Sequence, residues 1–389
     1  MMRIGAVVRR GAAVGAVALL VAGASLAWAA VVNPKVTPTW QTNGRVNAIQ
    51  VVGSTVYIGG KFTSVRPAGD PLGTGEVPRN RVAAFNITTG ALLPWNPNAN
   101  GTVQAIAVSG STVYLGGSFT QVGGKGHQRL AAVDTSGGAP IAAFKPTMDA
   151  EVLTLALAGS DVYAGGMFTT VNGAAHTYLA ALDATTTSTP GALDPAFTGS
   201  ADNGVLASTM SADGTKLVIG GNFTHVDGSS QNHIAAVSPT TGATLPWATH
   251  TSYGIVALAA DANGIYAAGA GSGGNFAAFS PSTGSSKWVG GTNGNVQAIT
   301  VFNGEVYAGG HYTDYCGPQG GQHTCTNPIP RSKILAVDET SGALQSWHPS
   351  VNSTLGVFAL AGGAGYLELG GDFTKVAGTS QQGFAAFAQ

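Results

Sequence analysis

Polar side chains gather in short segments that directly precede a series of apolar runs. Their carboxylate, amide and imidazole groups make them candidates for binding an ion or a substrate. Asp149 and Glu151 are the only close carboxylate pair at the start of such a run. Carboxylates at this spacing suit a Ca²⁺ ion or a polar substrate, and they also occur on solvated loops. The polar set comprises Asn43, Asn100, Asp149, Glu151, Asp202, Asn203, His250, Asn293, His348 and Asn352. Asp149, Glu151, Asp202, Asn203, His250 and His348 are the candidate binding residues; no catalytic residue and no metal ligand is assigned.

These runs belong to a repeat that returns along the chain. Each unit holds a strand such as "VNAIQV" (46–51), a second strand such as "TVYIGG" (55–60), then x-F-T-x-V, and a third such as "RVAAF" (81–85). A final segment ends in an aromatic residue. The Gly-Gly pairs recur about 40 to 61 residues apart, a period typical of propellers and solenoids. They begin at Gly59, Gly116, Gly165, Gly220, Gly309 and Gly370, with Ala268-Gly269 in the remaining place.

The two ends of the repeat complement each other. The last unit stops at "GFAAFAQ" after its third strand, and the segment "NPKVTPTW" near the N-terminus is a fourth strand with nothing before it. Such a first segment can complete the last sheet and close a ring, which removes open sheet edges. The sequence therefore predicts an all-β fold, a seven-bladed β-propeller of four-stranded blades over residues 30–389, with the N-terminal strand completing the last blade.

Residues that recur in every unit are predicted to be structural. Asn, Asp or Ser follows the third strand, as at Asp134 and Asp338, where its side chain can bond the amide two residues later. The recurring aromatic residues are predicted to pack between blades, with an aromatic ligand cage as the alternative. The second-to-third-strand connections are long in unit one (64–81) and unit six (314–333) and almost absent in unit five.

The N-terminus predicts export. Arg3, Arg9 and Arg10 precede an apolar run from Gly11 to Ala30, and Ala27-Trp28-Ala29 supplies small residues for cleavage. Residues 1–29 are therefore predicted to be a secretory signal peptide, with an uncleaved membrane anchor as the alternative. Without them the net charge is 14 − 18 = −4. In an exported chain the two cysteines, Cys316 and Cys325, are expected to form a local disulfide. A metal site shared with His311 and His323 is the alternative.

Composition excludes several classes of function. The chain has 17 Lys and Arg residues against 18 Asp and Glu residues. It therefore lacks the excess of positive charge that binding to nucleic acid requires. Gly-Gly is not followed by a helix, which excludes a phosphate-binding loop, and the motifs G-x-S-x-G, H-E-x-x-H and the EF-hand are absent. No cofactor is predicted. With 58 Gly and only 9% charged residues, the composition fits stacked sheets that are buried on both faces.

The phrase "VYIGGKFTSV…RVAAFNITTGALLPW" (56–95) resembles the delta-60-type β-propeller repeats of secreted and surface proteins from bacteria. It is also similar to repeats in fungal cortical-marker ectodomains. The resemblance covers Asn33 to Gln389 and implies a seven-bladed propeller with no shared catalytic residue. "AVDETSGALQSW" (Ala336 to Trp347) is similar to the tryptophan-docking motif of quinoprotein dehydrogenases. The count of seven units and the separated cysteines depart from that pattern.

The sequence therefore predicts a monomeric, non-enzymatic binding module, secreted or at the cell surface, that uses one face of the ring. Its partner is an unidentified polymer or protein, carbohydrate included. The alternative is a secreted carbohydrate-active enzyme, a hydrolase or lyase, with Asp149, Glu151 or Asp202 at the mouth of the ring. A purely structural wall or adhesion component is a third hypothesis.

Overall fold

The computed structural model describes residues 32–271, 273–318 and 325–389. The predicted signal peptide over 1–29 lies outside these residues, as does His323. Within them all regular structure is β-strand, which confirms the all-β prediction. The described residues hold no helix long and apolar enough to cross a membrane.

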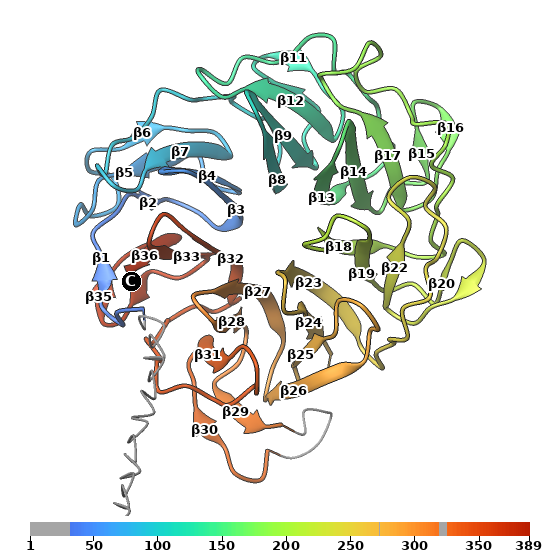
Figure 1. Ribbon diagram of the computed structural model, residues 1–389. Coiled ribbons are helices and arrows are strands. Elements are labelled where there is room, and N and C mark those ends of the chain that lie inside the picture. Colours follow the sequence, from blue (N-terminus) through green and yellow to red (C-terminus); the bar gives the residue numbers. More distant parts are fainter. Residues whose placement is uncertain (1–31, 272, 319–324) are drawn as a thin grey trace, which may run out of the picture.

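Antiparallel sheets stand around a common axis, each with an inner, a middle and an outer strand (Figure 1). Each inner strand neighbours the next one along the chain, and β32 neighbours β3, so the series closes on itself. The inner strands are β3 (Val46–Val52), β8 (Val103–Ser109), β13 (Val152–Ala158), β18 (Val205–Met210), β23 (Gly254–Ala260), β27 (Val296–Phe302) and β32 (Val357–Gly363).

The middle and outer strands follow in chain order. The middle strands are β4 (Thr55–Gly60), β9 (Thr112–Gly117), β14 (Asp161–Gly166), β19 (Leu217–Gly221), β24 (Ile265–Ala270), β28 (Glu305–Gly310) and β33 (Tyr366–Gly371). The outer strands are β7 (Val82–Asn86), β12 (Leu130–Asp134), β17 (Leu179–Asp183), β22 (Ile234–Val237), β25 (Asn275–Phe279), β31 (Ile334–Asp338) and β36 (Phe384–Ala388).

The predicted joining of the two chain ends is confirmed. β1 (Val36–Thr37) pairs antiparallel with β36, with Val36 opposite Phe387. The amide of Asn33 also donates to the Ala388 carbonyl at 2.8 Å. The last sheet is thus made of strands from both ends of the chain, in the order β1-β36-β33-β32.

A regular fourth strand is less common than predicted. Besides β1, only β26 (Ser286–Thr292) forms one; elsewhere among the described residues the fourth segment makes a single bridge, such as Phe85–Leu92. Pro94, Pro195 and Pro246 fall in three of these segments. Because proline has no amide hydrogen to donate, it limits the ladder there.

Most middle-to-outer connections form a small hairpin that lies toward the rim (Figure 1). The described residues of the connection from β24 to β25 form none, as predicted for unit five. The hairpins are β5 (Ser64–Arg66) with β6 (Val77–Pro78), β10 (Gln121–Val122) with β11 (Lys125–Gly126), β15 (Thr170–Val171) with β16 (Ala174–Ala175), β20 (His225–Val226) with β21 (Ser229–Ser230), β29 (Asp314–Gly317) with β30 (Ile329–Pro330), and β34 (Lys375–Val376) with β35 (Thr379–Ser380).

Each hairpin is tied to the segment that leads into the same unit. β2 (Gln41–Thr42) pairs with β5, and β26 pairs with β29, which extends one sheet to six strands. Elsewhere a single bridge does this, such as Met148–Val171. We call the end of the sheets that carries the hairpins and the segments leading into the inner strands the hairpin face. The opposite end, with the inner-to-middle and outer-to-fourth turns, is the turn face.

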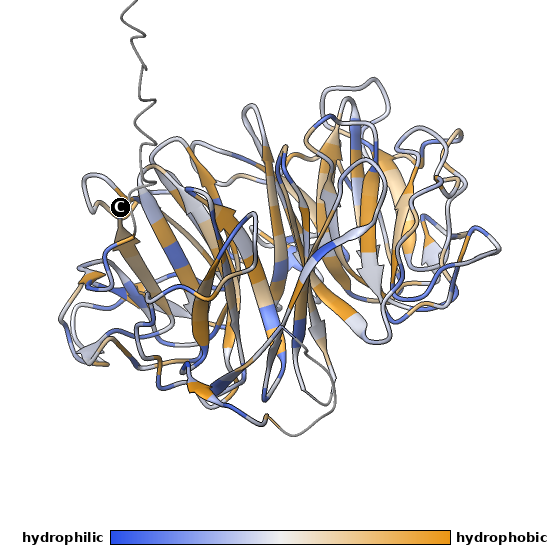
Figure 2. Ribbon diagram, turned by 60° about the horizontal axis from the view of Figure 1, so that its bottom comes forward, coloured by the Kyte–Doolittle hydropathy of each residue, from blue (hydrophilic) through white to orange (hydrophobic). Residues whose placement is uncertain are grey.

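The core lies between neighbouring sheets. One cluster joins Tyr57, Val82 and Trp95 to Val103 and Leu115 of the following sheet. The Gly-Gly pairs allow this approach: a Cβ on Gly59 would lie 2.6 Å from Val103 Cγ1, and one on Gly60 would lie 2.1 Å from the Arg45 carbonyl oxygen. Hydrophobic residues run along the strands in Figure 2, and hydrophilic residues are more frequent on the connections.

Candidate functional site

Asp149 takes part in a hydrogen-bonded clasp that ties the segment before β13 to the hairpin of the same unit. Its carboxylate accepts from the Thr169 amide at 2.8 Å and from the Thr169 hydroxyl at 2.6 Å. Asp202 does the same with the amide and hydroxyl of Thr224, at 2.8 and 2.7 Å. Asparagine makes the equivalent clasp in four other units: Asn43 with Thr63, Asn100 with Thr120, Asn293 with Thr313, and Asn352 with Thr374.

The clasp keeps its carboxylates ionised. Hydrogen bonds from the hydroxyl and amides of Thr169 and Thr170 lower the pKa of Asp149 to about 2. The pKa of Asp202 is lowered as well, by its bonds with Thr224 and His225, against the opposing effect of desolvation. His225 Nδ1 lies 3.0 Å from this carboxylate. Carboxylates with such pKa values hold no proton near neutral pH and so cannot serve there as general acids.

The other predicted binding residues are not brought together with these two. Glu151 is half-buried directly before β13, and the exposed Asn203 accepts from the Gly204 amide at 2.7 Å. His250 is exposed beside Trp247 and Thr249 in a surface groove of about 420 Å³. His348 is exposed in the segment before β32, where its Nδ1 contacts the Ser346 carbonyl. The candidates therefore spread over the segments leading into β13, β18, β23 and β32.

The recurring residues have the structural roles predicted for them. The Asp134 carboxylate accepts from the amides of Ser136 and Gly137, which forms the expected turn. Trp95 is fully buried against Tyr57, and its indole donates to the Asp134 carbonyl of the next sheet at 2.9 Å. A ring buried in this way has no free face for a ligand cage.

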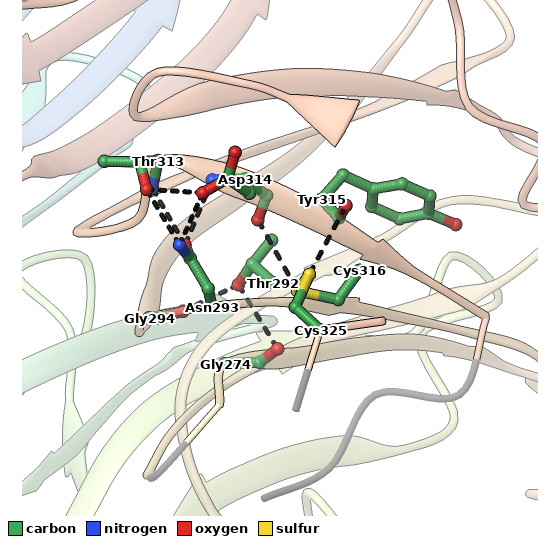
Figure 3. Close-up of a disulfide and its surroundings, with 9 residues drawn as sticks. All are labelled: Gly274, Thr292, Asn293, Gly294, Thr313, Asp314, Tyr315, Cys316 and Cys325. Carbon is green, nitrogen blue, oxygen red and sulfur yellow. Dashed lines mark hydrogen bonds between the residues drawn. A yellow bond between two sulfur atoms is a disulfide. The ribbon is translucent and has the colours of Figure 1, made fainter. Parts of the chain in front are cut away.

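Cys316 and Cys325 form the predicted disulfide, which joins β29 to the segment that leads into β30 (Figure 3). The Asn293 clasp lies beside it in the same view. Because the two sulfur atoms are bonded to each other, neither is a thiolate that could bind a metal. The described residues contain no group of three or more His, Cys, Asp or Glu side chains that could hold a metal ion.

The inner strands enclose a cavity of about 240 Å³ around the axis, on the side of the hairpin face. Its lining has an apolar side and a side that includes polar residues. Leu153, Leu206 and Val256 form one wall. The other wall contains Phe358, Asn47 and Gln104, and the Asn47 amide donates to Gln104 Oε1 at 2.8 Å.

Arg45 directly precedes β3 and contacts Phe358, one of the residues that line this cavity. Its guanidinium carbon is 4.3 Å from the centroid of the Phe358 ring, a cation–π geometry. Desolvation lowers the pKa of Arg45, and the charge of Asp372 partly opposes this. Sequence reasoning missed this pair because it searched the connections rather than the strand starts. The first residue of the inner strands is mostly Val, whereas the second residue differs from unit to unit. This variation was the signal in the sequence that could have identified Phe358.

Charge is divided unevenly between the two faces. Among the described residues, the turn face has few cations (Lys35, Lys216 and Lys287) and many carboxylates: Asp134, Asp161, Asp183, Asp213, Asp261, Glu305, Asp338 and Glu339. The hairpin face has both signs, with Asp70, Glu76, Asp149, Glu151, Asp202, Asp227, Asp314 and Asp372. Its cations are Arg45, Lys61, Arg66, Arg79, Arg81, Lys125, Arg129, Lys145, Arg331, Lys333 and Lys375.

No known protein family and no curated protein matches this chain by sequence. Solved structures do match. A chain of the mitotic checkpoint complex aligns with a TM-score of 0.61 at 12% identity, covering 100% of this chain and 99% of its own. The WD40 β-propeller domain of Doa1 aligns with a TM-score of 0.58 at 11% identity, covering 92% of this chain and 98% of its own. The computationally designed Ika8 protein aligns with a TM-score of 0.55 at 15% identity, covering 92% of this chain and 100% of its own. At these identities the likeness concerns the fold alone, and together with the radial sheets it shows that this chain folds as a β-propeller.

Proposed function

We propose that this chain is an exported binding scaffold that holds an acidic macromolecular partner, a protein or a polymer, on its hairpin face. The observation that carries the proposal is the separation of charge: most cations lie on the hairpin face, while carboxylates dominate the turn face. Such a field attracts an acidic surface to one face and repels it from the other. The hairpins also differ in length and sequence between units, as partner-binding loops do.

Export is part of this proposal. It is supported by the charged and apolar N-terminal residues and by the disulfide, because disulfides persist in oxidising compartments. A carbohydrate-active enzyme receives no comparable support. The carboxylates that such an enzyme would use, Asp149 and Asp202, occupy a structural position that asparagine fills in other units.

Charge reversal on each face tests the proposal. The triple variant Lys125→Glu, Lys145→Glu, Lys375→Glu changes three exposed lysines of the hairpin face. The matched control, Lys35→Glu, Lys216→Glu, Lys287→Glu, makes the same change in net charge on the turn face. Binding of the full mature chain to isolated cell envelopes of the source organism is measured by sedimentation. We expect affinity to fall at least tenfold in the first variant and less than twofold in the control.

Equal losses in both variants, or no loss in either, would contradict the hairpin face as the docking surface. Protease treatment of the envelopes then separates the two kinds of partner. A protein partner is lost on digestion, whereas a polymer partner is retained.

A further inference from the structure

The mouth of the central channel contains an arginine without the partners that other arginines of this face have. Arg66, Arg79 and Arg81 each donate to backbone carbonyl groups, such as those of Asp70, Leu93 and Lys61. Arg45 stacks on Phe358, and its Nε is buried with no hydrogen-bond partner among the described residues.

No carboxylate within the described residues forms an ion pair with Arg45; the pairs found there are Lys216–Asp213 and His225–Asp202. The charge of Asp372 acts on Arg45, and the Asp372 carboxylate already accepts from the amides of Leu355 and Gly356. The guanidinium is therefore held over an aromatic ring at a cavity, with its fork of donors unused by an internal anion. A planar fork of this kind matches a carboxylate.

Two side-chain carbonyl oxygens lack donors, each on the second residue of an inner strand, β3 or β27. Asn47 Oδ1 and Gln297 Oε1 are both buried without a partner among the described residues. The Gln297 side chain lies against Gly356, since a Cβ built on Gly356 would be 2.1 Å from Gln297 Oε1. Gly356 precedes Phe358 by two residues in the chain. Buried amide oxygens without donors are costly, so a ligand that donates hydrogen bonds here would be favoured.

We propose that this channel mouth is a binding site for a small hydroxylated carboxylate, in the chemical class of the sugar acids. Arg45 holds the carboxylate through two parallel N–H···O bonds, while ligand hydroxyl groups donate to Asn47 and Gln297. Leu153 and Leu206 across the cavity face the carbon skeleton. The cavity at this mouth has a volume of about 240 Å³.

This site does not depend on the docking of a macromolecule at the hairpin face. Its residues lie at the axis, and the lysines that test the proposed function lie on the surrounding connections. Loss of envelope binding with intact ligand binding, or the reverse, would therefore tell the two proposals apart.

Calorimetric titration of the full mature chain with galacturonate, galactose and acetate tests the site. We expect galacturonate to bind at least tenfold more tightly than galactose, which lacks the carboxylate, and than acetate, which lacks the hydroxyl groups. Arg45→Gln should abolish the preference over galactose, and Asn47→Leu should reduce the preference over acetate. Lys61→Gln, which removes a neighbouring exposed cation, should change neither preference more than twofold.

The proposal is wrong if the wild-type chain does not distinguish the three ligands, or if Arg45→Gln keeps its preference for galacturonate. Arg45→Lys provides a second variant should Arg45→Gln fail to fold. It retains the charge without the planar fork, so it should still lose several-fold in affinity for galacturonate.

Discussion

At the scale of single residues, a carboxylate at a promising position can be a structural acceptor. Asp149 and Glu151 look like a site in the sequence because a single residue, Ala150, separates the two carboxylates on one loop. The structure gives Asp149 the same partners that asparagine has in other units, namely the amide and hydroxyl of a threonine twenty or so positions later. The repeat of Asn or Asp with Thr was visible in the sequence, but their contact was not.

The clasp predicts how substitutions at Asp149 behave. Asp149→Asn keeps the acceptor for the backbone amides and should change the free energy of unfolding by less than about 0.5 kcal/mol at pH 7. Asp149→Ala removes the bonds to Thr169 and Thr170 and should cost roughly 1–2 kcal/mol. Urea unfolding measures both.

Acid titration of the same variants checks the electrostatic part. The pKa of Asp149 is about 2 in the folded chain, below its ordinary value of 3.8, so its contribution is present above about pH 4 and is lost as the pH falls toward 2. Asp149→Asn should remove this dependence. Identical acid unfolding of wild type and Asp149→Asn would contradict the clasp as an ionised acceptor.

Glu368 is a buried carboxyl group at a position that tyrosine fills in most other units. It is fully buried, both of its oxygens lack partners among the described residues, and desolvation raises its pKa from 4.5 to about 9. A raised acid pKa means that stability declines as pH rises between these two values, because the unfolded chain ionises first. The equivalent tyrosines are Tyr57, Tyr114, Tyr163, Tyr266 and Tyr307.

We therefore expect Glu368→Gln to flatten the pH dependence of stability. The two chains should be alike near pH 4.5, and the variant should be more stable at pH 8 by several kcal/mol, since each pKa unit corresponds to about 1.4 kcal/mol. Urea midpoints measured at pH 4.5, 6 and 8 provide the comparison, and parallel curves for the two chains would refute the assignment.

At the scale of elements, the strands were predictable and the fourth segment was not. Apolar runs of regular length predicted the inner, middle and outer strands, and the unmatched ends predicted the pairing of β1 with β36. The aromatic residue at the end of the fourth segment predicts that this segment is a strand. Among the described residues it pairs over a ladder only in β1 and β26. Elsewhere it makes a single bridge, and proline, which has no amide hydrogen to donate, falls in three of these segments.

The closing pair should be important for the stability of the whole ring. Val36 is 7% exposed and packs in the cluster that contains Phe387 and Leu367. Val36→Asp would bury a charge beside these side chains and should cost about 3 kcal/mol or more. Lys35→Asp introduces the same carboxylate at the exposed neighbour and should cost less than about 0.5 kcal/mol. Equal urea midpoints for the two variants would show that closure contributes little.

At the scale of the whole molecule, the ring joins residues that the sequence keeps apart. Arg45 and Phe358 come from opposite ends of the chain and meet only because β32 lies beside β3. No spacing in the sequence shows such a pair. The charge separation is of the same kind: the near-neutral composition hides it, and it emerges once strand direction assigns each turn to a face.

A lysine-modification footprint tests the docking proposal most directly. The mature chain, free or bound to cell envelopes, is treated with an amine-acylating reagent and analysed by mass spectrometry. Binding should protect Lys125, Lys145 and Lys375 of the hairpin face and leave Lys35 and Lys287 of the turn face fully reactive. Protection of the turn-face lysines instead, or no protection of either set in the bound chain, would contradict the account.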